Sequence, residues 1–370
     1  MADLSTIFTG IQFENPFLLA SAPPTESESN IARAYEAGWG GVVTKTIGLH
    51  PVTNVKGPKT KFVRVDSGGT RVSMGKRPDS TLLASWNWEL ISDKGLDWWV
   101  PRLESLKRAF PKKVLVASIM AGSGNDKELA NWQVLTRAVQ DAGVDAIELN
   151  FSCPHMDRVD MGANVGKDKV LCSVSTQAVK EVARVPVWVK LTPATANIVE
   201  EAEATFIGGA DAISSSNTFP SIPLIDPETL DFEVNVDGYA SSGGLGGPAI
   251  LLQSLAKMAE LTQAFPDREF SGIGGVSGFG QAASYFLLGC GTVQVATAAM
   301  LDHAIGPNVI NALTSGMTTF LERNAHRGWN SLADFRGYHR TRIVPHSQIA
   351  RPDAADYRGG YDDEAEGYAR

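Results

Sequence analysis

Eight short and almost wholly apolar runs recur along the 370 residues, separated by stretches with helical patterns. The runs are residues 16–22, 39–47, 113–120, 145–153, 185–193, 210–218, 268–275 and 292–300. Strands that are apolar on both faces are typical of a parallel sheet covered by helices, and eight strand–helix repeats are the number that closes a barrel. The sequence therefore predicts an α/β protein whose fold class is the (β/α)8 TIM barrel.

Three of the intervening stretches are amphipathic and end in glycine, as helices commonly do. They are residues 29–38, 127–143 and 197–209. A doubly wound open sheet is the alternative arrangement for alternating strands and helices. It is disfavoured because no GxGxxG motif follows the first run, where a dinucleotide-binding fold would place it.

Two long segments, residues 50–93 and 220–247, interrupt the repeat after the second and sixth runs. Both follow strand ends, and the loops at the carboxyl ends of barrel strands build active sites. From Gly337 onward the chain is polar and rich in Arg, Asp and Tyr. We therefore expect a barrel domain over residues 1–336 and an irregular C-terminal tail or arm over residues 337–370.

Composition narrows the classes of function. A net charge of −8 argues against a nucleic-acid partner, and the basic stretch 55–64 is interpreted as a solvated loop. The three cysteines show no CxxC spacing, which predicts a reducing compartment, no disulfide framework and no metal site. No signal peptide and no apolar run near ~18 residues is present, so the sequence predicts a cytoplasmic protein without a membrane partner.

In a barrel, the carboxyl ends of all eight strands meet at one mouth. The residues that the sequence places there are Ala20, Ser21, Lys45, Thr46, Asn150, Cys153, Lys190, Ser216, Asn217, Thr218, Gly274, Gly275, Ala296 and Thr297. Glycines and small residues after the seventh and eighth strands are typical of a phosphate site, although Gly274 and Gly275 also suit an ordinary tight turn.

Lys45 and Lys190 each end an apolar run. A lysine buried at a strand end is costly unless it has an anionic or polar partner. One interpretation is a structural ion pair with a barrel acid such as Glu148. The other is that the lysines face the electron-rich edge of a redox cofactor, and together with a phosphate site this favours FMN as the cofactor.

Cys153 lies in a polar, turn-forming setting with Ser152, Pro154 and His155. There its thiol can transfer a proton opposite a hydride acceptor, whereas a buried packing role is the alternative. Cys172 and Cys290 lie in helical or turn patterns, and we expect both to pack.

Three amides, Asn87, Asn150 and Asn217, could hold a planar ring that alternates C=O and N–H groups. Each amide offers both a donor and an acceptor, which suits such a ring. By residue type alone, Asn87 and Glu89 would be solvated loop residues.

The chain resembles the FMN domain of dihydropyrimidine dehydrogenase and, more distantly, the class 1 dihydroorotate dehydrogenases. The resemblance covers roughly residues 10 to 335. It rests on "SWNWELIS", "IELNFSCPH", "VWVKLTP", "SSSNT", "SGGLGGPAI" and "GIGGVSGFGQAASYFLLGCGTVQVATA", which occur in the expected order. The NxE pattern at Asn87 and Glu89 belongs to the dihydropyrimidine branch.

The resemblance implies an oxidoreductase acting on the C5–C6 bond of a pyrimidine or related cyclic amide. Cys153 matches the general acid that protonates C5 while reduced flavin gives a hydride to C6, and Lys190 matches the lysine on the flavin N1 side. Asn87, Glu89, Asn150, His155, Asn217 and Thr218 are the implied substrate-binding residues. The implied FMN-binding residues are Ala20, Ser21, Lys45, Thr46, Asn150, Lys190, Ser216, Gly244, Gly274, Gly275, Ala296 and Thr297.

Two departures from the family stand out. Three scattered cysteines cannot hold the iron–sulfur clusters of dihydropyrimidine dehydrogenases, so electrons would pass to or from a soluble donor or acceptor, or a separate reductase. Residues 156–168 replace a longer, glycine-rich lid after the active cysteine. The resemblance allows a homodimer, for which the residues define no interface.

Three other functions stay open at this point. Dihydroorotate is the second candidate substrate, and its carboxylate would require a cationic partner. A flavin-free barrel could instead use Lys45 or Lys190 as a Schiff-base nucleophile. The third alternative is a non-catalytic FMN-binding or assembly subunit with a docking tail.

Overall fold

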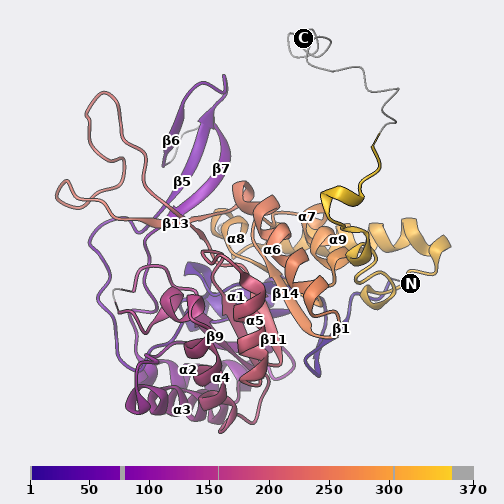
Figure 1. The fold of residues 1–370 in the computed structure, drawn as a ribbon, viewed down its shortest axis with the longest axis horizontal. Helices are drawn as coiled ribbons and strands as arrows, with labels where there is room; N and C mark the ends of the chain where they lie inside the picture. Colours follow the sequence, from indigo (N-terminus) through magenta and orange to yellow (C-terminus); the bar gives the residue numbers. More distant parts are fainter. Residues whose placement is uncertain (1, 76–79, 157, 303–304, 352–370) are drawn as a thin grey trace. The chain divides into compact units, whose positions relative to one another are not determined.

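The computed structural model describes residues 2–75, 80–156, 158–302 and 305–351 (Figure 1). The chain divides into two compact units, Met1–Arg340 and Thr341–Arg370. Residues 341–351 include a short 3-10 turn at His346–Gln348. The predicted tail, 337–370, lies outside the described residues from position 352 onward, and its role stays a prediction.

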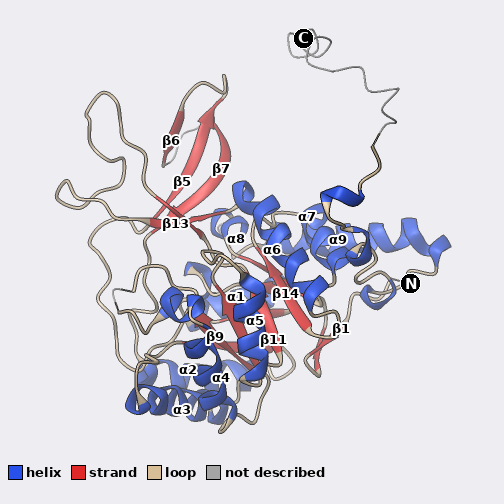
Figure 2. Ribbon diagram, in the orientation of Figure 1, coloured by secondary structure: helices blue, strands red, loops and turns tan. Residues whose placement is uncertain are grey.

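Eight parallel strands close into a barrel, which confirms the predicted fold class (Figure 2). They are β3 (Phe17–Leu19), β4 (Gly41–Val43), β8 (Val114–Ile119), β9 (Ala146–Phe151), β10 (Val187–Leu191), β11 (Ala212–Ser215), β14 (Glu269–Ile273) and β15 (Thr292–Val295). Each strand lies within one of the eight predicted runs. The last run was extended too far, because Thr297 begins a helix.

Helices follow the barrel strands and surround them (Figure 2). They are α1 (Glu28–Ala37), α2 (Leu96–Ala109), α3 (Asp126–Asp141), α4 (Lys169–Lys180), α5 (Ile198–Ile207), α6 (Leu251–Ala264), α7 (Phe279–Leu288), α8 (Thr297–Leu301) and α9 (Pro307–Asn324). The predicted glycine ending of α1 is confirmed, because Gly38 has φ +105°, a conformation that glycine adopts without strain. The side chain of Asn125 caps the start of α3 by accepting from the Glu128 N–H.

A small hairpin closes the bottom of the barrel. Its strands β1 (Thr6–Phe8) and β2 (Ile11–Phe13) pair antiparallel and present Phe8 and Phe13 to the barrel interior. Phe8 packs edge-on against Trp188 of β10, with ring centroids 5.0 Å apart. All three rings are fully buried, so the lower half of the barrel is a solid apolar plug.

The two long segments after β4 and β11 form one antiparallel sheet, which the sequence analysis treated as loops. Its order is β12 (Phe219–Ser221), β13 (Gly243–Gly246), β7 (Ser80–Asn87), β5 (Thr60–Asp66) and β6 (Val72–Met74). Gly244 of one segment pairs with Asn87 of the other. In Figure 1 this sheet projects beyond the barrel, so one rigid element carries residues from both segments to the strand ends.

In the part of the chain that the structure describes, no helix is both long and apolar enough to cross a membrane. The barrel unit continues past the predicted boundary at residue 336. The N–H groups of Gly337 and His339 donate to the Phe286 and Leu287 carbonyls of α7, at 2.9 Å each.

Candidate active site

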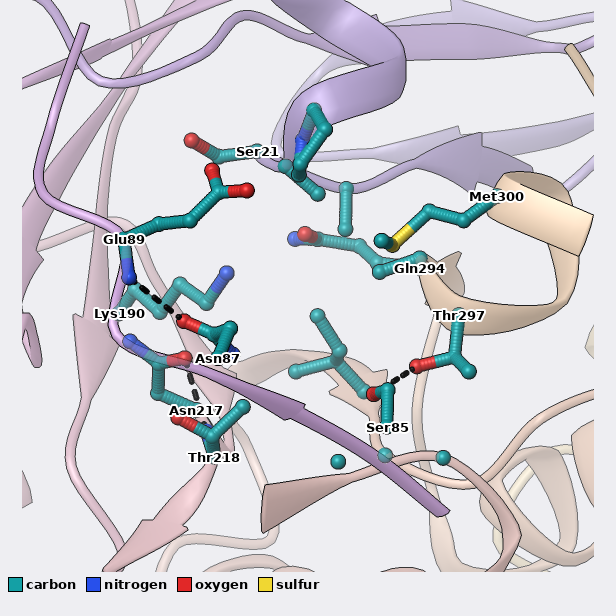
Figure 3. Close-up of a pocket in the computed structure, with 18 of the residues that line it drawn as sticks. Ser21, Ser85, Asn87, Glu89, Lys190, Asn217, Thr218, Gln294, Thr297 and Met300 are labelled. Carbon is teal, nitrogen blue, oxygen red and sulfur yellow. Dashed lines mark hydrogen bonds between the residues drawn. The ribbon is translucent and has the colours of Figure 1, made fainter. Parts of the chain in front are cut away.

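A cavity opens at the carboxyl ends of the barrel strands, beside the antiparallel sheet (Figure 3). The space between its lining atoms, with the open solvent at its mouth included, is about 1010 Å³. Its lining combines apolar side chains with hydroxyl, amide and charged groups, as the binding sites of small molecules do. Sixteen of the eighteen predicted site residues line this cavity, and the exceptions are His155 and Gly244.

The amide of Asn150 is held by hydroxyl groups from the neighbouring strands. Its Nδ2 donates to Thr46 Oγ1 at 2.8 Å, and Thr46 Oγ1 lies 2.8 Å from Ser118 Oγ. Its Oδ1 accepts from both the N–H and the hydroxyl of Ser152, at 3.0 and 2.8 Å. These bonds fix the plane of the amide and use both lone pairs of Oδ1, which leaves one N–H of Nδ2 for a ligand.

The other two predicted amides are fixed in the same way. Asn217 Nδ2 donates to the Ser152 hydroxyl at 2.8 Å, and its Oδ1 accepts from the Thr218 N–H at 2.8 Å. Asn87 Nδ2 donates to the Gly244 carbonyl at 3.3 Å, which joins two strands of the antiparallel sheet. Three amides from different elements therefore approach the cavity in fixed orientations.

Cys153 follows β9 in a tight turn at the cavity wall. Its carbonyl accepts from the Ala163 N–H at 2.9 Å. Gly162 has φ +57°, and a Cβ there would lie 2.5 Å from that carbonyl, so the close approach requires glycine. Burial raises the pKa of the Cys153 thiol, against smaller lowering effects from the His155 N–H and Lys45. The thiol is therefore protonated at neutral pH and suited to give a proton.

The segment after Cys153 is tied to the neighbouring loop by charges. Arg158 forms ion pairs with Asp160 at 2.6 Å and with Glu128 of α3 at 3.1 Å. The Gly124 N–H donates to Asp160 at 3.0 Å. Asp157, within the predicted lid of residues 156–168, lies outside the described residues.

Lys45 and Glu89 form a neutral pair at the cavity wall. Lys45 Nζ lies 2.6 Å from Glu89 Oε2, and Thr60 Oγ1 donates to Glu89 Oε1 at 2.7 Å. Burial and the Glu89 carboxylate raise the pKa of nearby Glu26, while Lys45 opposes that shift. The Lys45 charge is therefore already compensated within the protein.

Lys190 lies at the end of β10 and is buried, with 4% of its surface exposed. Among the described residues, Nζ forms no hydrogen bond or ion pair within 4 Å. Burial lowers the pKa of Lys190, partly opposed by the attraction of Glu148. Its side chain extends into the cavity in Figure 3, where an electron-rich ligand edge would supply the missing acceptor.

The end of the cavity below β14 and β15 is made of small residues. Gly274 and Gly275 have φ +127° and +76°, and a Cβ at these positions would lie 2.3 Å from Ser254 Oγ and 2.6 Å from Leu251 Cβ. Thr297 Oγ1 lies 2.8 Å from Ser85 Oγ, which links α8 to β7. Two glycines without side chains and two hydroxyl groups are thus brought together where the sequence predicted a phosphate group.

His155 and Gly244 are the two predicted site residues that do not line the cavity. His155 Nδ1 lies 3.1 Å from the Glu89 carbonyl, and burial lowers the pKa of its imidazole, so it supports the Glu89 backbone as a neutral ring. Gly244 leaves room for Thr218, whose Oγ1 would be 2.1 Å from a Cβ at position 244.

Several lining residues were missed by the sequence analysis, notably Thr60, Ser85, Ile250, Gln294 and Met300. Thr60 and Ser85 reach the cavity only through the antiparallel sheet. Gln294 carried a recognisable signal, since it is a polar residue inside the apolar strand "TVQV".

Comparison with known proteins supports the same grouping. The family model described as dihydroorotate dehydrogenase matches residues 3–317. The chain is 34% identical to dihydropyrimidine dehydrogenase (NADP(+)), chloroplastic, from Arabidopsis thaliana, and 35% identical to the NAD-dependent dihydropyrimidine dehydrogenase subunit PreA from Escherichia coli (strain K12). Each alignment covers 94% of this chain and 80% of the relative.

A more distant relative is the catalytic subunit of dihydroorotate dehydrogenase B (NAD(+)) from Thermoplasma acidophilum. It is 30% identical over 87% of this chain and 95% of its own length. The resemblance drawn from the motifs is confirmed. The chain belongs to the dihydroorotate dehydrogenase family and is an oxidoreductase of the dihydropyrimidine dehydrogenase type, acting on CH–CH groups.

Proposed function

We propose that this chain is an FMN-dependent oxidoreductase that reduces or oxidises the C5–C6 bond of an uncharged pyrimidine or a similar cyclic amide. One observation carries the proposal. The cavity brings together a buried thiol, three oriented amides, a glycine-lined end and a buried lysine that has no hydrogen-bond partner among the described residues. The family relatives are named for dihydropyrimidine and dihydroorotate substrates, which agrees with a ring of this kind.

The residues present fit FMN. Lys190 lacks an acceptor among the described residues, and it would bind the N1 side of the flavin ring. Gly274, Gly275 and Thr297 would hold the phosphate through backbone N–H groups and a hydroxyl. When bound, FMN supplies hydride chemistry.

The protein's own groups would orient the pyrimidine and handle the proton. Asn87, Asn150 and Asn217 would pair with the ring C=O and N–H groups, since each amide has capacity left for a ligand. Cys153 would give a proton to C5 in the direction of reduction and remove it in the direction of oxidation. The buried setting of the thiol would limit exchange of that proton with water.

Electrons would be exchanged with a separate protein or a soluble donor or acceptor. Iron–sulfur clusters are held by cysteine thiolates. Cys153 follows β9, Cys172 lies on α4 and Cys290 follows α7, so these three buried thiols do not form one ligand set. Two relatives are named as subunits, one NAD-dependent dihydropyrimidine dehydrogenase subunit and one catalytic subunit. A homodimer remains part of this proposal.

The visible spectrum of the purified protein tests the proposed function directly. A yellow protein that bleaches on anaerobic addition of dihydrouracil or dihydrothymine is the expected result, because hydride transfer from the substrate removes the flavin colour. A yellow protein that bleaches only with dihydroorotate would move the substrate to the second candidate. A colourless protein that cannot be reconstituted with FMN would contradict the proposal and favour Schiff-base chemistry on a lysine.

We expect Glu89→Gln to shift the substrate preference toward a carboxylated ring. In the wild type Glu89 neutralises Lys45 at 2.6 Å, so a substrate carboxylate finds no free charge there. Removing the charge of Glu89 leaves Lys45 free to attract a substrate carboxylate. About 1.4 kcal/mol of such attraction changes the ratio of the two kcat/KM values tenfold. The ratio of kcat/KM for dihydroorotate over dihydrouracil should rise at least about tenfold.

Thr60→Val is the matched control, because it removes the hydroxyl that donates to Glu89 at 2.7 Å without changing any charge. It should leave the ratio of the two kcat/KM values close to the wild type. An equal change in both variants would show that the charge of Glu89 does not set the preference.

A further inference from the structure

A buried polar layer lies between the apolar plug of the barrel and the floor of the cavity. Its members are side chains of β9, β11, β14 and β15 that are fully buried: Glu148, Ser214, Ser271, Thr292 and Gln294. Polar groups at such depth are costly unless they are paired, so the layer requires an explanation beyond packing.

Glu148 is the charged member of this layer. Its Oε2 accepts from Ser214 Oγ at 2.7 Å and from Gln294 Nε2 at 2.9 Å. Its Oε1 has no hydrogen-bond partner among the described residues, and neither has Gln294 Oε1. The free-energy cost of removing a carboxylate charge from water is larger than the stabilisation from two hydrogen bonds with neutral donors. A fully buried carboxylate of this kind therefore favours a nearby counter-charge.

The strand register brings one candidate counter-charge close. In the β9–β10 pair, Lys190 lies opposite Asn150, and Trp188 lies opposite Glu148. Side chains two apart on a strand share a face, so all four point to the barrel interior. Glu148 therefore lies one inward position below Asn150, beneath the cavity that Lys190 enters.

The other lysine of the cavity is already compensated, because Lys45 is paired with Glu89 at 2.6 Å. In the part of the chain that the structure describes, the charged groups that act on Lys190 are Glu148 of β9 and Lys45, which follows β4. The inward side chains of β11, β14 and β15 there include serines and Gln294. Gln294 lines the cavity (Figure 3). Its Nε2 donates to Glu148 Oε2 at 2.9 Å, so it connects the acid to the cavity floor.

We propose that Glu148 is a positioning residue that acts through Lys190. It is the buried counter-charge that keeps the lysine positively charged beneath the cavity, and Gln294 Nε2 holds its carboxylate through a hydrogen bond of 2.9 Å. The consequence for the flavin rests on the proposed function. There, a lysine kept cationic stabilises the negative charge that appears on reduction.

The proposal is tested first in flavin-free protein, which separates it from the proposed function. In protein labelled with 15N-lysine, with Lys190→Met used to assign the signal, the pH at which Lys190 loses its proton is followed by NMR. Glu148→Gln is isosteric and removes only the charge, so the lysine should lose its proton at lower pH. Glu148→Asp keeps the charge and should titrate closer to the wild type.

Equal titration of Lys190 in the wild type and in Glu148→Gln would overturn the proposal. So would identical behaviour of Glu148→Gln and Glu148→Asp, because that pattern indicates a role in hydrogen bonding alone. Ser214→Ala, which removes one neutral bond to Glu148, should move the titration less than Glu148→Gln does.

The Lys190→Met variant keeps the proposal testable if Glu148→Gln does not fold in the wild-type background. With the lysine removed, the charge of Glu148 has lost its counter-charge, so the free energy of unfolding should fall and should recover when Glu148→Gln is added to the Lys190→Met background. A double variant that is as unstable as Lys190→Met would overturn the proposal.

A second readout uses the flavin-loaded protein. Glu148→Gln should lower the midpoint potential of the bound FMN, since the reduced form loses stabilisation. The same substitution in a Lys190→Met background should cause no further shift, because the effect passes through the lysine. An equal shift in both backgrounds would contradict action through Lys190.

Discussion

Cys153→Ala is expected to keep its FMN and lose between about a hundredfold and about ten-thousandfold of its turnover with dihydrouracil. The thiol lines the cavity and is 6% exposed, so its removal takes away the proton donor and leaves the glycine-lined end unchanged. Flavin content by absorbance and kcat by steady-state assay are the two measurements.

Cys172→Ala is the matched control for this variant. Cys172 is a fully buried thiol on α4 that donates to the Val165 carbonyl at 3.2 Å and does not line the cavity. It should retain wild-type turnover. Undiminished turnover in Cys153→Ala would mean that another group moves the proton.

The pH dependence of the two reaction directions should be opposite. Burial raises the pKa of Cys153, so the protonated thiol persists above the range of an ordinary cysteine. Reduction of the pyrimidine uses the thiol and should slow as pH rises through that raised pKa. Oxidation uses the thiolate and should accelerate over the same range, and both limbs should disappear in Cys153→Ala.

Lys190→Met should bind a pyrimidine yet reduce its flavin about a hundredfold to a thousandfold more slowly, because it removes a preorganised positive charge from the site where negative charge develops. The buried amine has no other acceptor among the described residues, so its role is directed at a ligand. Anaerobic stopped-flow bleaching with dihydrouracil measures the rate, and flavin absorbance before mixing reports the content.

Lys169→Met serves as the control, because that lysine pairs with Glu200 on the outer surface of the barrel at 2.5 Å. It should bleach at the wild-type rate. A normal rate and normal flavin content in Lys190→Met would show that the flavin reaction does not depend on this charge, and the assignment of Lys190 would be wrong.

The barrel could be predicted from the sequence because each strand lies in a short and mainly apolar run that is followed by a helical pattern. Strand ends such as Lys190 and Cys153 then follow from one topological rule, namely that parallel strands share a mouth. The same rule led to the predicted phosphate site, since Gly274 and Gly275 directly follow β14 and Thr297 comes two residues after the end of β15.

The antiparallel sheet could not be predicted, because its pairing is not local. Gly244 pairs with Asn87, and four barrel strands, β8, β9, β10 and β11, lie between these two residues along the chain. The glycine-rich β13 has no alternating apolar pattern, and it forms a strand only where β7 offers an edge. Thr60 and Ser85 are therefore absent from the predicted site residues, because only the long-range pairing of the antiparallel sheet brings them to the cavity.

Two other residues are placed by local structure. The family resemblance implies His155 as a substrate-binding residue, and the turn after β9 places its Nδ1 3.1 Å from the Glu89 carbonyl, so its contact with a substrate stays a prediction. Gln294 is absent from the predicted site residues, although alternation along β15 places both Thr292 and Gln294 inside the barrel.

The hairpin plug of Phe8 and Phe13 has a consequence for kinetics. With the lower end filled by buried rings, the described cavity is served by the mouth at the strand ends. A pyrimidine and a small electron donor would then both reach the flavin through this mouth, so they would bind one after the other and not together. Double-displacement kinetics, with parallel double-reciprocal plots and inhibition by each reactant at high concentration, would indicate this alternating binding.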